Sequence, residues 1–210
     1  DISTSISEAW DVEVADMDND GDLDIVSAAM ASGASGAATI HWFENDGAAD
    51  PSFTASTIAT SADGPSKVHM ADLDNDGDLD IISASSVDDT IAWYENNGAA
   101  NPTFTSSNIA TNIDGAYEIY AEDIDADGDI DILAAASNEN RVVLFKNNGA
   151  SDPVFTSSDI ITSIKPFGLD VQDIDGDGDL DIGVAAHDGL NTVSSEDKVA
   201  WYSNDGASSP

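Results

Sequence analysis

The sequence predicts an all-β fold, a β-propeller or a propeller segment, with four blades of four antiparallel strands each. Three observations predict it. A unit of roughly 50 residues occurs four times, apolar and polar residues alternate within each unit, and Asn-Gly or Asp-Gly steps separate the apolar segments. Four short strands in a unit of this length are typical of a propeller blade. We expect 1–210 to be a single repeat domain or a piece of a longer tandem array, with approximate units 1–51, 52–102, 103–153 and 154–210.

Three motifs define the repeat. The first has the pattern Asp-x-Asp-x-Asp-Gly-Asp-x-Asp and occupies residues 16–24, 72–80, 123–131 and 173–181. The second reads Ile-Ala-Trp-Tyr-Glu-Asn-Asn-Gly in its second copy and occupies residues 40–47, 91–98, 142–149 and 199–206. The third, Pro-x-Phe-Thr, occurs at 51–54, 102–105 and 153–156.

The second unit illustrates the predicted strands. We expect strands at Lys67 to Ala71, Asp80 to Ser85, Thr90 to Glu95 and Thr103 to Ala110. The Asn-Gly and Asp-Gly steps after the third strand predict tight turns, because Gly and Asn adopt positive φ at little cost. Large aromatic residues recur in register between units and predict the blade core, namely Trp42, Trp93, Trp201, Phe53, Phe104 and Phe155.

Both ends of the chain fall within the predicted fourth strand of a unit. Residues 1–6 match 159–164, and the chain stops just before a further Pro-x-Phe-Thr motif. We expect either an outer strand completed across the termini or a longer tandem array. An unfilled strand position would also accept a strand from a neighbouring copy.

The composition excludes several classes of partner. There are 42 acidic residues against 5 Lys and Arg, which gives a formal net charge of −37. Nucleic acids and anionic lipid surfaces would repel such a chain. No apolar run is long enough to span a membrane, so membrane insertion is not expected. The absence of Cys excludes disulfides and thiolate metal sites.

The acidic motif predicts a metal site in each unit. Carboxylates at positions 1, 3, 5 and 9, with the backbone carbonyl of position 7, supply the oxygens that Ca²⁺ prefers, and Gly at position 6 permits the reversal. A solvated acidic turn is the alternative, and four complete copies argue against it. An EF-hand would require Glu at position 12, where the sequence has Ser27, Ser83, Ala134 and Val184. Mg²⁺ is disfavoured because it prefers to retain several waters.

We therefore expect about four Ca²⁺, one per loop. The predicted metal-binding residues are Asp16, Asp18, Asp20, Asp22, Asp24, Asp72, Asp74, Asp76, Asp78, Asp80, Asp123, Asp125, Asp127, Asp129, Asp131, Asp173, Asp175, Asp177, Asp179 and Asp181.

These units resemble the FG-GAP/VCBS-type repeats of integrin-α-like β-propellers. The resemblance covers essentially the whole chain and rests on the acidic loop and the Trp-Tyr-Glu-Asn-Asn-Gly segment. It implies Ca²⁺ between the first two strands of each blade. It also implies a secreted or cell-surface propeller used in adhesion, in sugar binding, or as a module attached to an enzyme. Such propellers usually have seven blades, so the resemblance does not imply that four blades close a ring.

Loop parity predicts where partners bind. The acidic loops and the Asn-Gly turns share one rim, whereas the loops between strands two and three, at 31–38, 87–89 and 187–197, share the opposite rim with those between blades. The loops between blades carry Trp10, Ser66, Tyr117 and Phe167 at one equivalent position. These aromatic rings either contact a glycan or protein partner or pack between blades.

A second position, three residues before each acidic loop, holds Glu13, His69, Tyr120 and Asp170. It either lines a hydrated channel or contributes to a site. The candidate ligand-binding residues are therefore Trp10, Tyr117, Phe167, His69 and Tyr120.

No nucleophile motif or zinc-binding His pair is present, so we expect a non-catalytic protein. The favoured function is a secreted or cell-surface calcium-binding module for adhesion or for glycan or protein binding. An alternative is a structural subunit of a surface filament or array, self-associating through the incomplete strand. A third is a domain of a polysaccharide-degrading enzyme, for which His69 and Tyr120 are the only candidate pair.

Overall fold

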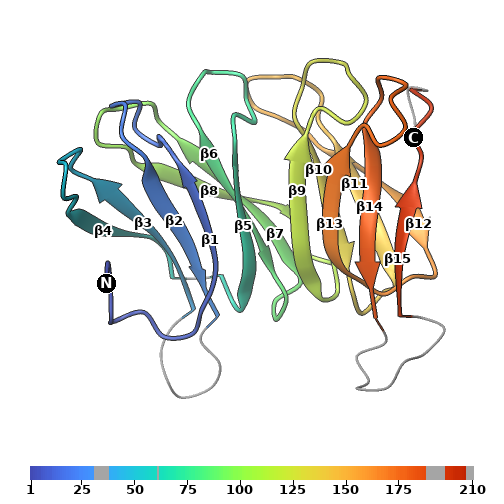
Figure 1. Ribbon diagram of the computed structural model, residues 1–210, viewed down its shortest axis with the longest axis horizontal. Coiled ribbons are helices and arrows are strands. Elements are labelled where there is room, and N and C mark those ends of the chain that lie inside the picture. The colour runs from blue at the N-terminus through green and yellow to red at the C-terminus, as the bar shows by residue number, and fades with distance from the viewer. Residues whose placement is uncertain (31–37, 61, 188–196, 207–210) are drawn as a thin grey trace. The chain divides into compact units, whose positions relative to one another are not determined.

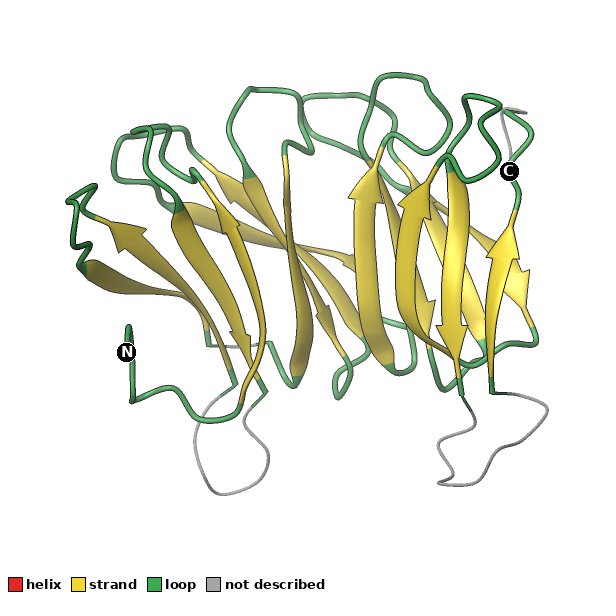
Figure 2. Ribbon diagram, in the orientation of Figure 1, coloured by secondary structure: helices red, strands yellow, loops and turns green. Residues whose placement is uncertain are grey.

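The structure is a computed structural model that describes residues 1–30, 38–60, 62–187 and 197–206. All the regular structure in these residues is β-strand, as Figure 2 shows. The described part of the chain contains no helix with the length and apolarity needed to cross a bilayer.

The strands form four antiparallel sheets, or blades, in which each strand pairs with the next along the chain (Figure 1). Blade 1 consists of β1 (Ala9–Ala15), β2 (Asp24–Ala29), β3 (Thr39–Asn45) and β4 (Phe53–Ala59). Blade 2 consists of β5 (Pro65–Ala71), β6 (Asp80–Ser85), β7 (Thr90–Asn96) and β8 (Phe104–Ala110). Blade 3 consists of β9 (Ala116–Glu122), β10 (Asp131–Ala136), β11 (Arg141–Lys146) and β12 (Thr156–Thr162). Blade 4 consists of β13 (Pro166–Gln172), β14 (Asp181–Ala186) and β15 (Lys198–Tyr202).

The predicted all-β fold with four blades is confirmed. In blade 2 the structure reproduces the predicted second strand and moves the ends of the other three by at most two residues. Blade 4 has three strands among the described residues, and residues 1–6, which resemble a fourth strand, belong to none of the sheets.

The chain divides into two compact units. The first contains Asp1–Asp72 and Asp76–Asn112, and so blades 1 and 2; the second contains Leu73–Asn75 and Ile113–Pro210, and so blades 3 and 4. Each unit has its own apolar core between its two sheets. In the first unit, Ile40 and Trp42 of blade 1 share a core with Val68 and Tyr94 of blade 2. That 1–210 is a single domain remains a prediction.

The recurring aromatic residues are only partly in the core. Trp42 and Trp93 are buried, as predicted, and Trp42 packs edge-on against Phe104 of the adjacent blade, with ring centroids 6.5 Å apart. The three phenylalanines are half-buried. The prediction is wrong for Trp201, which is 51% exposed, because no described strand covers that face of blade 4.

Candidate metal centre

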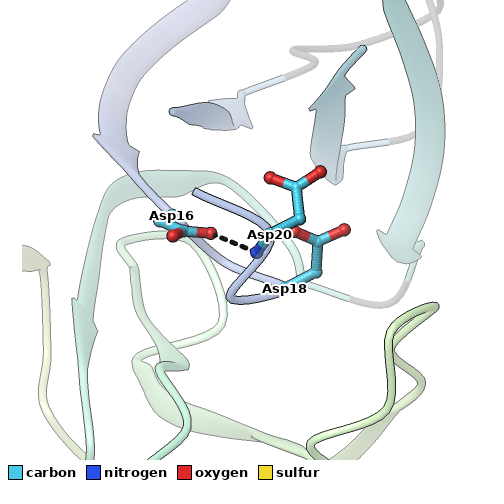
Figure 3. Close-up of side chains that lie close together, drawn as sticks. All are labelled: Asp16, Asp18 and Asp20. Atoms are coloured by element: carbon cyan, nitrogen blue, oxygen red, sulfur yellow. Dashed lines mark hydrogen bonds between the residues drawn. The ribbon is translucent and has the colours of Figure 1, made fainter. Parts of the chain in front are cut away.

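The carboxylates of the acidic loops converge in every blade. Each loop joins the first strand of a blade to the second, and in each loop three carboxylate oxygens from different residues lie within 4.8 Å of one another. Figure 3 shows the first of these clusters on the loop that follows β1. The clusters comprise Asp16, Asp18 and Asp20; Asp72, Asp74 and Asp76; Asp123, Asp125 and Asp127; and Asp173, Asp175 and Asp181.

Backbone hydrogen bonds to the first carboxylate fold the loop. Asp16 accepts bonds from the N–H groups of Asp20 and Gly21, each 3.0 Å long, and the first appears in Figure 3. Gly21 has φ of +97°, which a residue with a side chain rarely adopts. Asp72 and Asp123 accept the equivalent bonds in their loops. The sequence spacing therefore produces one local fold repeatedly, which is why the carboxylates converge.

The last Asp of each loop is buried and joins the loop to the sheet. Asp24 accepts hydrogen bonds from the backbone N–H of Asn45 (2.8 Å), from Trp42 Nε1 (3.0 Å) and from Met17 N–H (3.3 Å). Asp181 similarly accepts bonds from Asn204 and Ile174. The bond from Asn204 contributes most to lowering the pKa of Asp181. Position 9 therefore has a structural role, and only in the fourth loop does it also belong to the carboxylate cluster.

The Asp at position 7 directs its carboxylate toward the glycine of the Asn-Gly or Asp-Gly turn. A Cβ added to Gly47 would lie 2.0 Å from Asp22 Oδ2, so the turn requires glycine there for space as well as for φ. Asp78 Oδ1 also accepts a hydrogen bond of 2.9 Å from Asn19 of the preceding loop. The side chains at position 7 therefore do not belong to the three-residue clusters. That position 7 binds the ion through its backbone carbonyl stays a prediction.

Several carboxylate oxygens in the loops are buried without a hydrogen-bond partner. They are Asp18 Oδ1, Asp125 Oδ1 and Asp131 Oδ2. Burial, with the charges of Asp20 and Asp24, raises the pKa of Asp18. Burial also raises the pKa of Asp131 to about 6. Buried anionic oxygens without donors are costly unless a cation compensates them, so this donor set fits a hard divalent cation.

In blades 2 and 4, an asparagine from the turn connects neighbouring acidic loops within a unit. Asn96 Nδ2 donates to the backbone carbonyl of Met17 in the preceding loop (3.1 Å) and to that of Leu79 in its own loop (3.0 Å). In the second unit, Asn204 bonds to Ile124 O and Leu180 O in the same way. These bonds place the acidic loops and the turns at one end of each blade, as loop parity predicts.

One residue beside the third loop was missed in the sequence reasoning. Lys146 ends β11, and its ammonium contacts the carboxylate of Asp125 and lies 3.2 Å from Asp127 Oδ2. Partial burial opposes ionisation of Asp127, but the Asp129 N–H and Lys146 together lower its pKa. The signal was present in the sequence, because the second motif has Lys only in its third copy.

The candidate ligand-binding residues are distributed over both units. The position predicted in the loops between blades is instead the second residue of the first strand of each blade, because these strands begin earlier than expected. Trp10 in the first unit is half exposed. In the second unit the rings of Tyr117 and Phe167 meet edge-on, with centroids 5.1 Å apart, and His187 stacks on Phe167 at 3.9 Å. His187, which the sequence did not indicate for this cluster, follows β14 directly. Residues 31–37 and 188–196 of the predicted variable loops lie outside the described residues.

The other two candidates, His69 on β5 and Tyr120 on β9, also belong to different units. His69 Nδ1 lies 2.7 Å from Glu13 Oε1, which joins β5 to β1 within the first unit. Tyr120 packs against the apolar core of the second unit. Each side chain therefore has a structural contact in its own unit.

The repeat geometry agrees with a comparison of the chain with protein families. The FG-GAP-like repeat family matches residues 16–83, 72–134 and 123–184. The chain belongs to this family. Each match begins at the first Asp of one loop and ends in the second strand of the next blade, so it spans two successive acidic loops.

No curated protein matches the chain. Similar solved structures include the Vibrio cholerae biofilm matrix protein Bap1, at 18% identity and a TM-score of 0.48, where the similarity covers 86% of this chain and 29% of Bap1. An Agrocybe aegerita lectin that recognises non-reducing terminal N-acetylglucosamine has 19% identity and a TM-score of 0.47, over 95% of this chain and 67% of the lectin. This FG-GAP-like chain therefore spans less than a third of Bap1.

Proposed function

We propose that the chain is a calcium-binding, non-catalytic module of a secreted or cell-surface protein, with one Ca²⁺ in each acidic loop and about four per chain. The observation that carries this proposal is the convergence of three carboxylates in each of four loops. The buried oxygens of Asp18 and Asp125 that lack hydrogen-bond partners support it independently.

Calcium suits these loops better than magnesium. Ca²⁺ accepts six to eight oxygens with flexible geometry, whereas Mg²⁺ requires a near-ideal octahedron and retains several waters. Loop carboxylates together with a backbone carbonyl satisfy the first requirement. Millimolar extracellular calcium fills weak sites of this kind, which favours a secreted or cell-surface location.

A thermal melt tests the metal proposal. We expect Ca²⁺ to raise the Tm well above its value in chelator, and Mg²⁺ at the same concentration to raise it much less. The physical reason is that each ion binds the folded loops and not the unfolded chain. A Tm that is the same in Ca²⁺ and in chelator would contradict the proposal.

For the partner, we propose a glycan or a protein that binds at the rim opposite the acidic loops. The support is the cluster of Tyr117, Phe167 and His187, together with the half-exposed ring of Trp10. Flat aromatic faces with polar neighbours are suited to stacking on sugars or anchoring proteins. Binding on a glycan array that is lost in Trp10→Ala or Phe167→Ala, with an unchanged Tm, would support this site. Binding that survives both substitutions would exclude it.

Self-association is a second candidate, favoured by two apolar faces that are exposed among the described residues. On blade 1, Val12 is 59% exposed, whereas the equivalent Val68 of blade 2 is fully buried. On blade 4, Val199 is 88% exposed, whereas the equivalent Ile40 of blade 1 is fully buried against the next blade. Faces of this kind fit another blade. A molar mass that increases with concentration would support self-association, and a constant monomer mass would exclude it.

The proposal of a non-catalytic module rests on the surroundings of the histidines. His69 is paired with Glu13, and His187 is stacked on Phe167. Tyr120, the other member of the candidate catalytic pair, packs against the apolar core of the second unit. Turnover of an acidic polysaccharide that is abolished by His69→Ala would overturn this proposal.

A further inference from the structure

The third acidic loop differs from the others in the residue that faces it from the sheet. Lys146 Nζ lies against Asp125 and Asp127, two members of the third carboxylate cluster. The Asp125 side chain is almost fully buried, at 2% exposure, and the Lys146 side chain is 39% exposed. A cation of the chain itself therefore occupies space beside these two carboxylates.

The charge at the equivalent position is not the same in all four repeats. It is Glu44 in the first unit, Glu95 in the second, Lys146 in the third and Ser203 in the fourth. Glu44 and Lys146 hold the same register position in their blades, because each pairs with the threonine of the Pro-x-Phe-Thr motif on the fourth strand, Thr54 and Thr156 respectively. The sequence therefore places a negative charge beside loops one and two, and a positive charge beside loop three.

Lys146 is one of five Lys and Arg residues in the chain, which has 42 acidic residues. Other bases make their ion pairs outside the acidic loops: Lys67 pairs with Asp11, and Arg141 pairs with Glu139 and Asp159. Placing one of so few cations on a carboxylate cluster compensates a large local repulsion.

We propose that Lys146 is an internal counter-ion of the third loop and competes there with Ca²⁺ for Asp125 and Asp127. The competition with Ca²⁺ rests on the proposed calcium function, whereas the counter-ion role of Lys146 in the absence of calcium does not. The third loop accordingly binds Ca²⁺ more weakly, because the ammonium must leave before the ion enters. It also tolerates the absence of calcium better, because its carboxylates are already partly compensated.

Three variants test this role. Lys146→Gln removes the charge and retains a polar side chain, and Lys146→Glu reproduces the residue of the first two repeats. Lys198→Gln is the matched control, because it removes the same charge from an exposed position on β15. Glu44→Lys is the converse change and places an ammonium beside the first loop.

The first readout is the Tm in chelator, which requires no calcium binding. We expect Lys146→Gln to melt about 2–4 °C below Lys198→Gln, because only the former exposes a carboxylate cluster to its own repulsion. Equal Tm values in chelator would overturn the inference, whatever the calcium behaviour of the protein.

The second readout is a calcium titration by calorimetry. We expect three stronger sites and one weaker site in the unsubstituted chain. Lys146→Glu should strengthen the weaker site about tenfold, and Glu44→Lys should weaken one of the stronger sites by a similar factor. Four indistinguishable sites in the unsubstituted chain would overturn the inference and leave the calcium function intact. No calcium binding at all would overturn the calcium function, and the Tm in chelator would still decide the role of Lys146.

Discussion

The bond from Asn96 to the neighbouring loop allows a quantitative test of how the blades are joined. Asn96→Ala removes four side-chain hydrogen bonds: to Met17 O, a weak one to Met17 Sδ, one to Leu79 O and one from Gly98 N–H. Asn45→Ala, at the equivalent position of blade 1, removes two: to Leu23 O and from Gly47 N–H. The two variants therefore differ in the bonds to Met17, which cross between blades and of which the bond to the Met17 carbonyl is the stronger.

That bond ends at a buried position, since the Met17 side chain is fully buried and Asn96 is 2% exposed. Leaving a buried carbonyl unsatisfied costs about 1–3 kcal/mol. We therefore expect Asn96→Ala to lose about 2 kcal/mol more free energy of unfolding than Asn45→Ala. For a chain of this size the difference corresponds to a Tm lower by about 4–8 °C.

The assay is urea unfolding followed by tryptophan fluorescence, with both variants at the same saturating Ca²⁺ concentration, so that metal linkage does not enter the comparison. Equal losses in Asn96→Ala and Asn45→Ala would refute the reasoning, because the bond between blades would then contribute nothing.

Two further predictions concern the loops themselves. Trp42→Phe should lower the free energy of unfolding by about 1.5–3 kcal/mol, because it removes the hydrogen bond from Nε1 to Asp24. Trp93→Phe should lower it by less, because Trp93 Nε1 is buried without a partner. Equal decreases in urea unfolding would contradict this. In chelator, the free energy of unfolding should fall as the pH rises from 4 to 7. Burial raises the pKa of Asp131 from 3.8 to about 6, so the folded state holds this proton more tightly than the unfolded chain does. The loss should reach up to about 3 kcal/mol once Asp131 is ionised in both states. In saturating Ca²⁺ the slope of Tm against pH should reverse, because the ion requires ionised carboxylates, and a falling Tm in both conditions would contradict this.

The repeat made most of the fold predictable. Alternation and turn residues located β6 from Asp80 to Ser85, with both ends as the structure has them. The spacing of the acidic motif also predicted that its carboxylates converge, because the hydrogen bonds that fold the loop are local. Each joins residues no more than five apart in sequence, such as Asp16 and Gly21.

Long-range contacts were less predictable. Asp24 accepts bonds from Asn45 and Trp42 of its own blade, whereas Asp78 accepts one from Asn19 of another blade. The two side chains therefore have different roles. Trp201 follows the sequence pattern of a core residue but is exposed, because burial depends on the neighbouring sheet and not on the residue. The contact of Lys146 with the third loop likewise required the structure.

The number of calcium ions bound per chain tests the central claim most directly. The measurement is equilibrium dialysis of the purified chain against buffered Ca²⁺ in excess Mg²⁺, followed by elemental analysis of both compartments. Four converging carboxylate clusters predict saturation at about four Ca²⁺ per chain, with the last ion bound at higher concentration than the other three. Fewer than one Ca²⁺ per chain, or complete displacement by Mg²⁺, would contradict the claim.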